Sequence, residues 1–262
     1  AGYGEFAPIG GLDSDRGVLV GQVAAECLTR AGVERVTADR SLPLQVTREV
    51  EGAGIAVELD SDMGVADRRS KSDQELSHLR CAQQVTEAAM QLACQTVARA
   101  SAGPDGVLVH GGEPLTAQRV RAIIDTFLLG EGFHNPESIV AGGATGADCH
   151  DTGSGPLRSG EPVIIDIFPQ DRATLYNGDC TRTVVHGDVP PPLAAMHAAV
   201  VEAKAAATAA VAPGVSGAAV HAETIRVLSE HGYAEALAAG DETATITHGT
   251  GHGIGLDVHE AP

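Results

Sequence analysis

Three features that would indicate other classes of protein are missing from the 262-residue sequence. No apolar run approaches the roughly 20 residues that a membrane-spanning helix needs. Residues 1–15 lack the basic start and the apolar stretch of a secretory signal. Lysine occurs only as Lys71 and Lys204, and the net charge of −18 disfavours nucleic acid as a partner because phosphates would repel this surface. We therefore expect a cytoplasmic protein that binds neither membrane nor nucleic acid.

The cysteines form no recognisable framework. There are five, an odd number, and none stands in a C-x-x-C arrangement. This usage is typical of reduced thiols in a cytosolic protein. It therefore predicts no disulfide scaffold and no cysteine-based zinc site.

The composition that is present is that of a folded globular protein. Charged residues make up 20% of the chain and the AVILMFWYC set 43%, and 262 residues suffice for one large domain or for a small and a larger one. The acidic, lysine-poor surface has two explanations that stay open. A halophilic source would screen the self-repulsion with salt, whereas a GC-rich genome would favour arginine and alanine codons.

The chain has a small first part and a larger second part. Residues 18–30 have helical spacing, and residues 33–37 and 54–59 resemble strands, so the first part is a small α/β pattern. The polar segment 60–72 is the expected boundary. Ser72 and Glu75 then form a capping box at the start of a helix that we expect to end at Gly103.

The second part mixes helices and strands. Further helices are expected over residues 116–129, 193–211 and 216–230, and strands over 138–141, 162–168 and 180–185. Neither the dinucleotide-binding glycine motif nor a P-loop is present. The pattern therefore predicts an α/β or α+β domain that is not a nucleotide fold.

Two aspartates stand where a carboxylate is costly. Asp166 lies inside the apolar segment 163–168, and Asp179 begins the segment Asp-Cys-Thr-Arg-Thr after a loop. If the two segments pair as antiparallel strands, both carboxylates lie on one face. Close anionic oxygens repel one another unless a cation sits between them. The pair therefore suggests a divalent metal site, although a hydrogen-bonded structural carboxylate explains Asp166 alone about as well.

A histidine cluster follows near the end of the chain. His248, His252 and His259 fall within twelve positions and are separated by glycines, which permit close backbone approach. A lone histidine is usually a solvated surface residue, and this reading fits the seven histidines at 78, 110, 134, 186, 197, 221 and 231. The cluster is harder to explain in that way, so it is a candidate for chemistry.

The ordered set of Asp166, Asp179-x-Thr-Arg-Thr and His248-Gly-x-Gly-His-x-x-Gly-x-x-x-His-Glu resembles the pita-bread metallopeptidases, over roughly residues 71–262. The first histidine of the motif resembles that of the creatinase/aminopeptidase P-like branch, which contains Xaa-Pro aminopeptidases and prolidases. The resemblance implies a pita-bread catalytic domain over residues 69–262 and a partial creatinase-like α/β domain over residues 1–68. It also implies a homodimer.

The resemblance implies roles for six residues. Asp166 corresponds to a bidentate ligand of one metal, Asp179 to the bridging ligand and His252 to an imidazole ligand. His150, His248 and His259 correspond to histidines that bind the substrate and stabilise the tetrahedral intermediate without ligating metal. Two divalent ions are implied, with manganese expected and cobalt, zinc or iron as alternatives.

The activity implied is hydrolysis of the bond before proline at the N-terminus of a short peptide, by water held between two metals about 3.5–4 Å apart. Prolidase activity on a dipeptide is the near alternative. A non-catalytic pita-bread module that binds peptide or protein, and a metal-free creatine-hydrolysing relative, are the others.

Two departures from the family pattern bear on these expectations. The loop between Asp166 and Asp179 is two residues longer than the commonest one, an even change that keeps both side chains on one face. The family's two glutamate ligands follow the histidine motif, whereas this sequence stops at Pro262. Glu260 matches only the acidic position of that motif. We therefore expect a chain trimmed at both ends, whose catalytic domain lacks its C-terminal strands.

Overall fold

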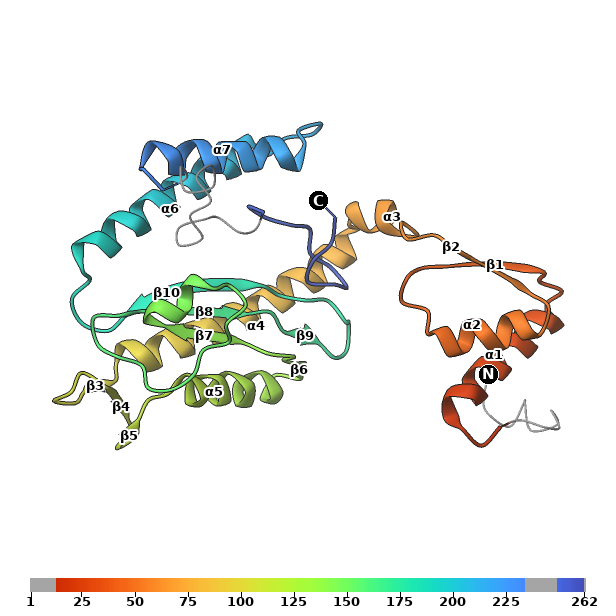
Figure 1. Cartoon of the computed structure of the whole chain (residues 1–262), viewed down its shortest axis with the longest axis horizontal. Coiled ribbons are helices and arrows are strands. Elements are labelled where there is room, and N and C mark those ends of the chain that lie inside the picture. Colours follow the sequence, from red (N-terminus) through yellow and green to blue (C-terminus); the bar gives the residue numbers. More distant parts are fainter. Residues whose placement is uncertain (1–12, 234–248, 262) are drawn as a thin grey trace. The chain divides into compact units, whose positions relative to one another are not determined.

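The computed structural model describes residues 13–233 and 249–261, and the chain divides into two compact units, residues 1–68 and 69–262 (Figure 1). In the first unit, the strands β1 (Arg35–Ala38) and β2 (Ala56–Leu59) pair in parallel. Its helices are α1 (Arg16–Arg30), α2 (Leu44–Gly52) and the short α3 (Val65–Arg69), which ends at the boundary. Ala25, Val50 and Ile55 form its small core. The sequence patterns predicted α1 and both strands but not α2, which lacks a side-chain cap at Pro43.

The long helix α4 (Asp73–Ala98) opens the second unit, and its predicted capping box is present. The Glu75 backbone N–H donates to Ser72 Oγ at 3.4 Å, and the Ser72 backbone N–H donates to Glu75 Oε2 at 2.7 Å. The helix ends at Ala98, earlier than the predicted stop at Gly103, because the short strand β3 (Ser101–Ala102) begins there. Apart from its end, the helix is confirmed.

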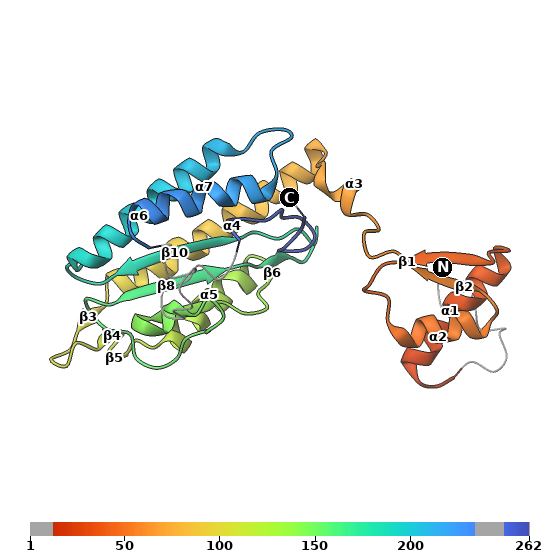
Figure 2. The same cartoon turned by 45° about the horizontal axis from the view of Figure 1, so that its top comes forward.

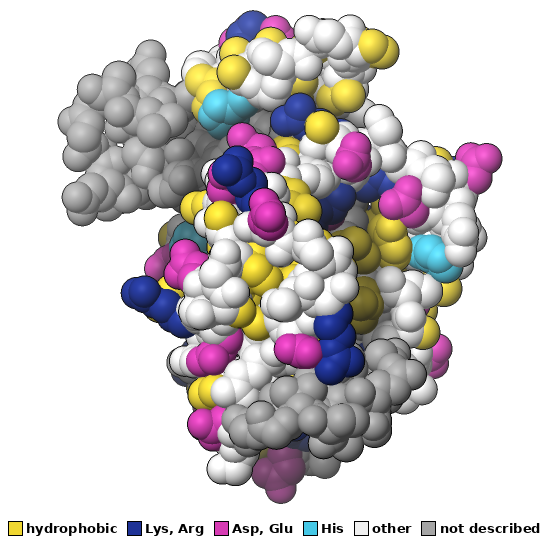
Figure 3. Space-filling model, turned by 90° about the vertical axis from the view of Figure 1, so that its right-hand side faces the viewer, with side chains coloured by type: hydrophobic (Ala, Val, Ile, Leu, Met, Phe, Trp, Pro, Cys, Tyr) yellow, Lys and Arg dark blue, Asp and Glu magenta, His cyan; other side chains and the backbone are white. Residues whose placement is uncertain are grey.

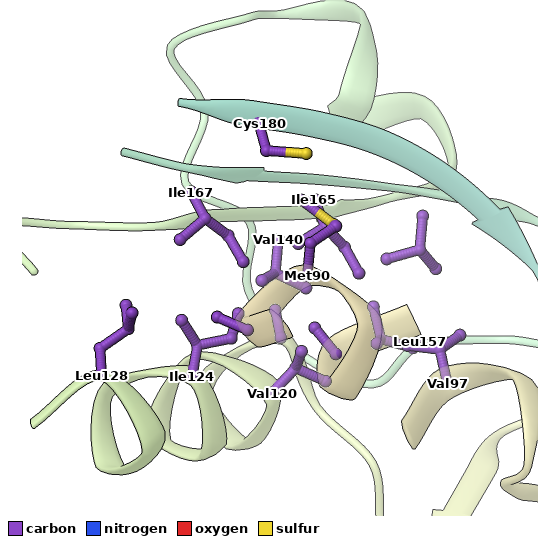
Figure 4. Close-up of a cluster of buried hydrophobic side chains, with 14 of the residues drawn as sticks. Met90, Val97, Val120, Ile124, Leu128, Val140, Leu157, Ile165, Ile167 and Cys180 are labelled. Atoms are coloured by element: carbon purple, nitrogen blue, oxygen red, sulfur yellow. The ribbon is translucent and has the colours of Figure 1, made fainter. Parts of the chain in front are cut away.

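A three-stranded antiparallel sheet forms the centre of this unit, in the order β10 (Cys180–Val185), β8 (Pro162–Ile167), β7 (Ile139–Gly142). Alternate residues of β8 point to opposite faces, and Val163, Ile165 and Ile167 are fully buried. These side chains pack on α4 and on α5 (Ala117–Gly130), as Figure 4 shows. The other face of β8 carries Asp166.

Smaller elements complete the unit. They are the sheet β3–β4–β5, with β4 at Leu108–His110 and β5 at Glu113–Pro114, the pair of β6 (Phe133–His134) with β9 (Gln170–Asp171), and the 3₁₀ helix η2 (Gly143–Ala147). Helices α6 (Pro191–Ala210) and α7 (Gly217–Glu230) pack on each other through small side chains such as Ala199 and Ala203. Figures 1 and 2 both place this helix pair across the sheet from α5. Among the residues described, no helix has the length and apolarity to cross a membrane.

Charged side chains pair mainly at the surface. Arg226 on α7 contacts Glu223 at 2.9 Å and Glu230 at 2.8 Å, and these side chains are all more than 40% exposed. Over the face drawn in Figure 3, acidic side chains lie beside basic ones. Exposed pairs of this kind contribute at most about 1 kcal/mol each. They therefore add little to the fold.

The capping box makes the stability of the second unit depend on pH. Hydrogen bonds from the Ser72 backbone N–H and hydroxyl, and one from the Tyr176 hydroxyl, lower the pKa of Glu75 from 4.5 to about 2. A carboxyl whose pKa is lower in the folded state stabilises it above the unfolded pKa, and this contribution is lost as the pH falls toward the folded one. Glu75→Gln should therefore lower the urea midpoint at pH 6, and by progressively less toward pH 3.

Urea titrations of both proteins between pH 3 and pH 6 check this expectation. Glu87→Gln, on the same helix but outside the capping box, controls for the loss of one carboxylate. A difference for Glu75→Gln that stays constant across the pH range would contradict the assigned role of its charge.

Candidate metal centre

The pairing of β8 with β10 brings the two aspartates to one face, as the sequence predicted. Thr181 lies opposite Asp166 in the antiparallel register. Asp179 stands two positions before Thr181, so its side chain leaves the sheet on the same side. That side is turned away from the apolar core of α4 and α5, because the alternate residues Ile165 and Ile167 occupy the core.

The electrostatics of Asp166 favour a cation beside it. Burial raises the pKa of the Asp166 carboxyl above its ordinary value, and the neighbouring Asp179 carboxylate raises it further. A hydrogen bond from Thr181 Oγ1 to Asp166 Oδ1, 2.6 Å long, and the proximity of His259 lower it. Within the described chain, neither aspartate forms an ion pair with a lysine or an arginine. The extra negative charge is therefore left without a fixed cationic partner.

Helix α4 fixes the position of the backbone at Gly178 and Asp179, just before β10 begins. A Cβ atom built on Gly178 would lie 2.1 Å from Thr86 Oγ1 and 2.8 Å from the carbonyl oxygen of Ala82, so only glycine fits against the helix here. The next backbone N–H, of Asp179, donates to Gln83 Oε1 at 3.1 Å. The helix thus holds the start of β10 by close approach and by one hydrogen bond.

Two histidines of the predicted cluster lie beside this face. His252 Nε2 is 3.3 Å from Asp179 Oδ2. Its Nδ1 is 2.9 Å from the carbonyl oxygen of Gly253, which can only accept, so Nδ1 carries the proton and Nε2 is the nitrogen able to ligate a metal. The rings of His252 and His259 meet edge to face with centroids 4.4 Å apart.

The segment that carries these histidines, residues 249–261, is held from two directions. The carbonyl oxygen of Gly255 accepts from the backbone N–H of Asn177 at 2.9 Å and from its side-chain amide at 3.0 Å. Asn177 is 4% exposed and lies in the loop between the two aspartates. On the other side, Thr250 Oγ1 contacts His221 Nδ1 and donates to Thr224 Oγ1, both at 2.8 Å, on α7. The segment is therefore bonded both to the loop between the two aspartates and to α7.

The remaining predicted residues are placed differently. His150 is exposed, and its side chain lies 3.8 Å from that of Asp148 and 3.7 Å from that of Cys149. Within the described residues it forms no hydrogen bond or ion pair with Asp166, Asp179, His252 or His259. His248 lies outside the described residues. In the described part of the chain, only the surface residues Asp148, Cys149 and His150 are found to place three ligand atoms within 4.8 Å of one another. Asp166, Asp179 and His252 are adjacent but more widely spread.

The donor chemistry of Asp166, Asp179 and His252 fits a divalent cation. Two carboxylates and one imidazole suit manganese, cobalt, zinc or iron. The repulsion that raises the pKa of Asp166 would be relieved by a positive charge between the carboxylates. Thr181 Oγ1 donates to Asp166 Oδ1, which holds this carboxylate in place on the face of the sheet.

Sequence reasoning missed several residues that position this centre. Gln83 and Asn177 gave no signal, because each acts on a backbone group far away in sequence. Thr181 is part of the motif that was noticed, and its position two residues after Asp179 could have assigned it to the same face. The close contact at Gly178 required knowing that α4 lies beneath it.

Comparison with solved structures identifies the architecture. The X-Pro aminopeptidase of Thermotoga maritima superposes with a TM-score of 0.74 at 22% sequence identity, covering 93% of this chain and 64% of that one. The dipeptidase PepE of Mycobacterium ulcerans superposes with a TM-score of 0.70 at 30% identity, covering 92% and 59%. The fold is therefore the pita-bread fold, as the sequence motifs predicted.

Residues 77–262 match the model of metallopeptidase family M24, so the chain belongs to that family of hydrolases. The Mycobacterium tuberculosis protein named "Probable dipeptidase PepE" is 34% identical over 190 residues, which cover 71% of this chain and 47% of the relative. This chain thus spans about half the length of these curated relatives.

Replacing Gly178 tests the packing that places Asp179. Gly178→Ala should lower the free energy of unfolding by about 1–3 kcal/mol, because the added Cβ must push α4 and β10 apart. Urea denaturation of the metal-free protein measures the change. Gly130→Ala is the matched control, since nothing lies within 4 Å of its Cβ, and in a helix it should stabilise by up to about 1 kcal/mol. Equal behaviour of the two variants would show that the close contact does not matter.

Proposed function

We propose that the protein is a metal-dependent Xaa-Pro aminopeptidase, which releases the residue preceding proline from the N-terminus of a short peptide. The observation that carries the proposal is the placement of Asp166, Asp179 and His252 side by side on the open face of the β8–β10 pair. Membership of family M24 supplies the reaction class. A relative in Pyrococcus horikoshii named "Xaa-Pro dipeptidase", 25% identical over 88% of this chain and 60% of that one, supports proline at the second position.

In this proposal Asp166, Asp179 and His252 hold two divalent metal ions, with manganese as the expected metal. Bound there, the metals would activate a water molecule and polarise the scissile carbonyl. Asp179, whose Oδ2 lies 3.3 Å from His252 Nε2 and whose charge raises the pKa of Asp166, would be a ligand of both ions. The substrate amide before proline has no N–H, so the protein must recognise the shape of the ring and cannot use that donor.

The histidines are proposed to bind substrate. His259 meets the ring of His252 edge to face and therefore borders the same face, where a ring N–H could donate to an oxygen that becomes negative during the reaction. His248 and His150 are proposed for the carbonyl and the proline side of the peptide. For His150 this requires its exposed loop to reach the site in the substrate complex.

An end-point assay tests the activity directly. The protein is incubated with an Xaa-Pro-Xaa tripeptide, an Xaa-Pro dipeptide and an Xaa-Ala-Xaa tripeptide, with Mn²⁺ or with chelator, and the released N-terminal residue is measured. We expect Mn²⁺-dependent cleavage of the tripeptide with proline. Preference for the dipeptide would favour prolidase activity, which the dipeptidase names of several relatives support. Absence of cleavage would contradict the proposal and favour a non-catalytic peptide-binding module.

Asp179→Asn tests the bridging ligand. It should lower Mn²⁺ affinity and turnover by about 100-fold or more, because a metal ligand is removed. Without metal its melting temperature should not fall, since one of two repelling carboxylates is neutralised. Titration calorimetry and melting curves provide the two measurements, and Asp188→Asn, at an exposed position after β10, is the control. Unchanged turnover would remove Asp179 from the site.

The homodimer and the cytoplasmic location stay predictions.

A further inference from the structure

An ion pair joins the beginning of the second unit to its last described residues. Lys71 Nζ lies 2.9 Å from Glu260 Oε2, and the two residues are 189 positions apart in sequence. Their side chains are only 13% and 6% exposed, unlike the surface pairs on α7. Taking two charges out of water is costly unless the geometry is good and further hydrogen bonds satisfy them. The surroundings of Glu260 supply such bonds.

The Glu260 carboxylate closes the segment that carries the histidines. Its Oε1 accepts from the backbone N–H of Leu256 at 3.0 Å and of Asp257 at 3.4 Å. The Glu260 backbone exchanges two hydrogen bonds with Gly253, each 2.9 Å long. The segment from 253 to 260 is thus a closed loop with the carboxylate on its inside.

The backbone of this loop is shaped around the carboxylate. A Cβ atom built on Gly255 would lie 2.6 Å from both oxygens of Glu260. The side chain could move aside only by leaving Lys71 and the two backbone N–H groups. Glycine at 255 therefore reserves the space that the buried charge occupies.

This loop determines how the two imidazoles meet. His252 immediately precedes Gly253, and His259 immediately precedes Glu260, so the paired backbone bonds bring the two rings to the same end of the loop. Their centroids are 4.4 Å apart there. We propose that Glu260, paired with Lys71, is a positioning residue that fixes His252 and His259 beside Asp179. Its consequence for metal binding and turnover rests on the proposed function, whereas its effect on the rings does not.

An ion pair with a merely structural role would stabilise the fold, and its removal would leave the environment of the two histidine rings unchanged. A positioning pair must also change the environment of the two rings when its charge is removed. Glu260→Gln is the suitable change, because the amide keeps an oxygen that can accept from Leu256 and Asp257 and loses only the charge. Lys71→Met removes the partner, and Lys71→Arg is the conservative change that keeps a cation there.

The first measurement uses the full chain without metal. The imidazole nitrogen resonances of His252 and His259 are recorded by NMR in the wild type and the variants, with His252→Gln and His259→Gln providing the assignments. Glu260→Gln and Lys71→Met should move both sets of resonances, and Lys71→Arg should leave them near the wild type. Val97→Ala, a fully buried change in α4, is the control for general loss of stability and should leave them in place.

The second measurement is Mn²⁺ binding by titration calorimetry, in which Glu260→Gln should weaken binding about tenfold, the lower end of the effect of groups that orient metal ligands. Unchanged ring resonances in folded Glu260→Gln would overturn the proposal. If that variant does not fold, Lys71→Met/Glu260→Gln leaves no unpaired buried charge and is subject to the same criterion. A wild type that neither binds Mn²⁺ nor cleaves peptide would contradict the proposed function, while the resonances would still decide the role of Glu260.

Discussion

The antiparallel pairing of β8 with β10 is the constraint on which the centre depends. It places two carboxylates on one face and leaves the other face of β8 to a core of Val163, Ile165 and Ile167. A shift of the register by one residue would turn Asp166 into that core. The apolar alternation that stabilises the sheet therefore also sets which way the side chains of Asp166 and Asp179 point.

The repulsion between Asp166 and Asp179 is the counterpart of that arrangement. Desolvation and the nearby charge both raise the pKa of Asp166, and in the part described no lysine or arginine pairs with it. A site of this kind is held in place by the surrounding fold in spite of its own electrostatics. The close packing of Gly178 on α4 and the hydrogen bond from Asp179 to Gln83 are what hold it. A cation bound between the carboxylates would therefore stabilise a geometry that already exists.

Local signals were the ones that sequence reasoning read correctly. The capping box of Ser72 and Glu75 needs only residues three positions apart, and the alternation along β8 needs only one strand. The helix α2 was missed because it is short and lacks a side-chain cap. The grouping of His252 with Asp179 was expected only from the resemblance to a known family, since nothing in their spacing requires it. His150 shows the converse, because the structure leaves it among its own neighbours.

The sequence by itself indicated the class of fold and singled out Asp166, Asp179 and the histidine cluster. These features could be recognised because apolar periodicity, glycine spacing and a charge inside an apolar segment depend only on residues close together in the chain. Only the tertiary structure decided how these groups are held. The carboxylate of Glu260 reaches Lys71 across 189 positions, and Asn177 captures the carbonyl of Gly255. Such contacts depend on how distant segments are packed. A hydrogen bond is equally strong whether its partners are near or far apart in sequence, so the sequence alone does not reveal which distant residues pair.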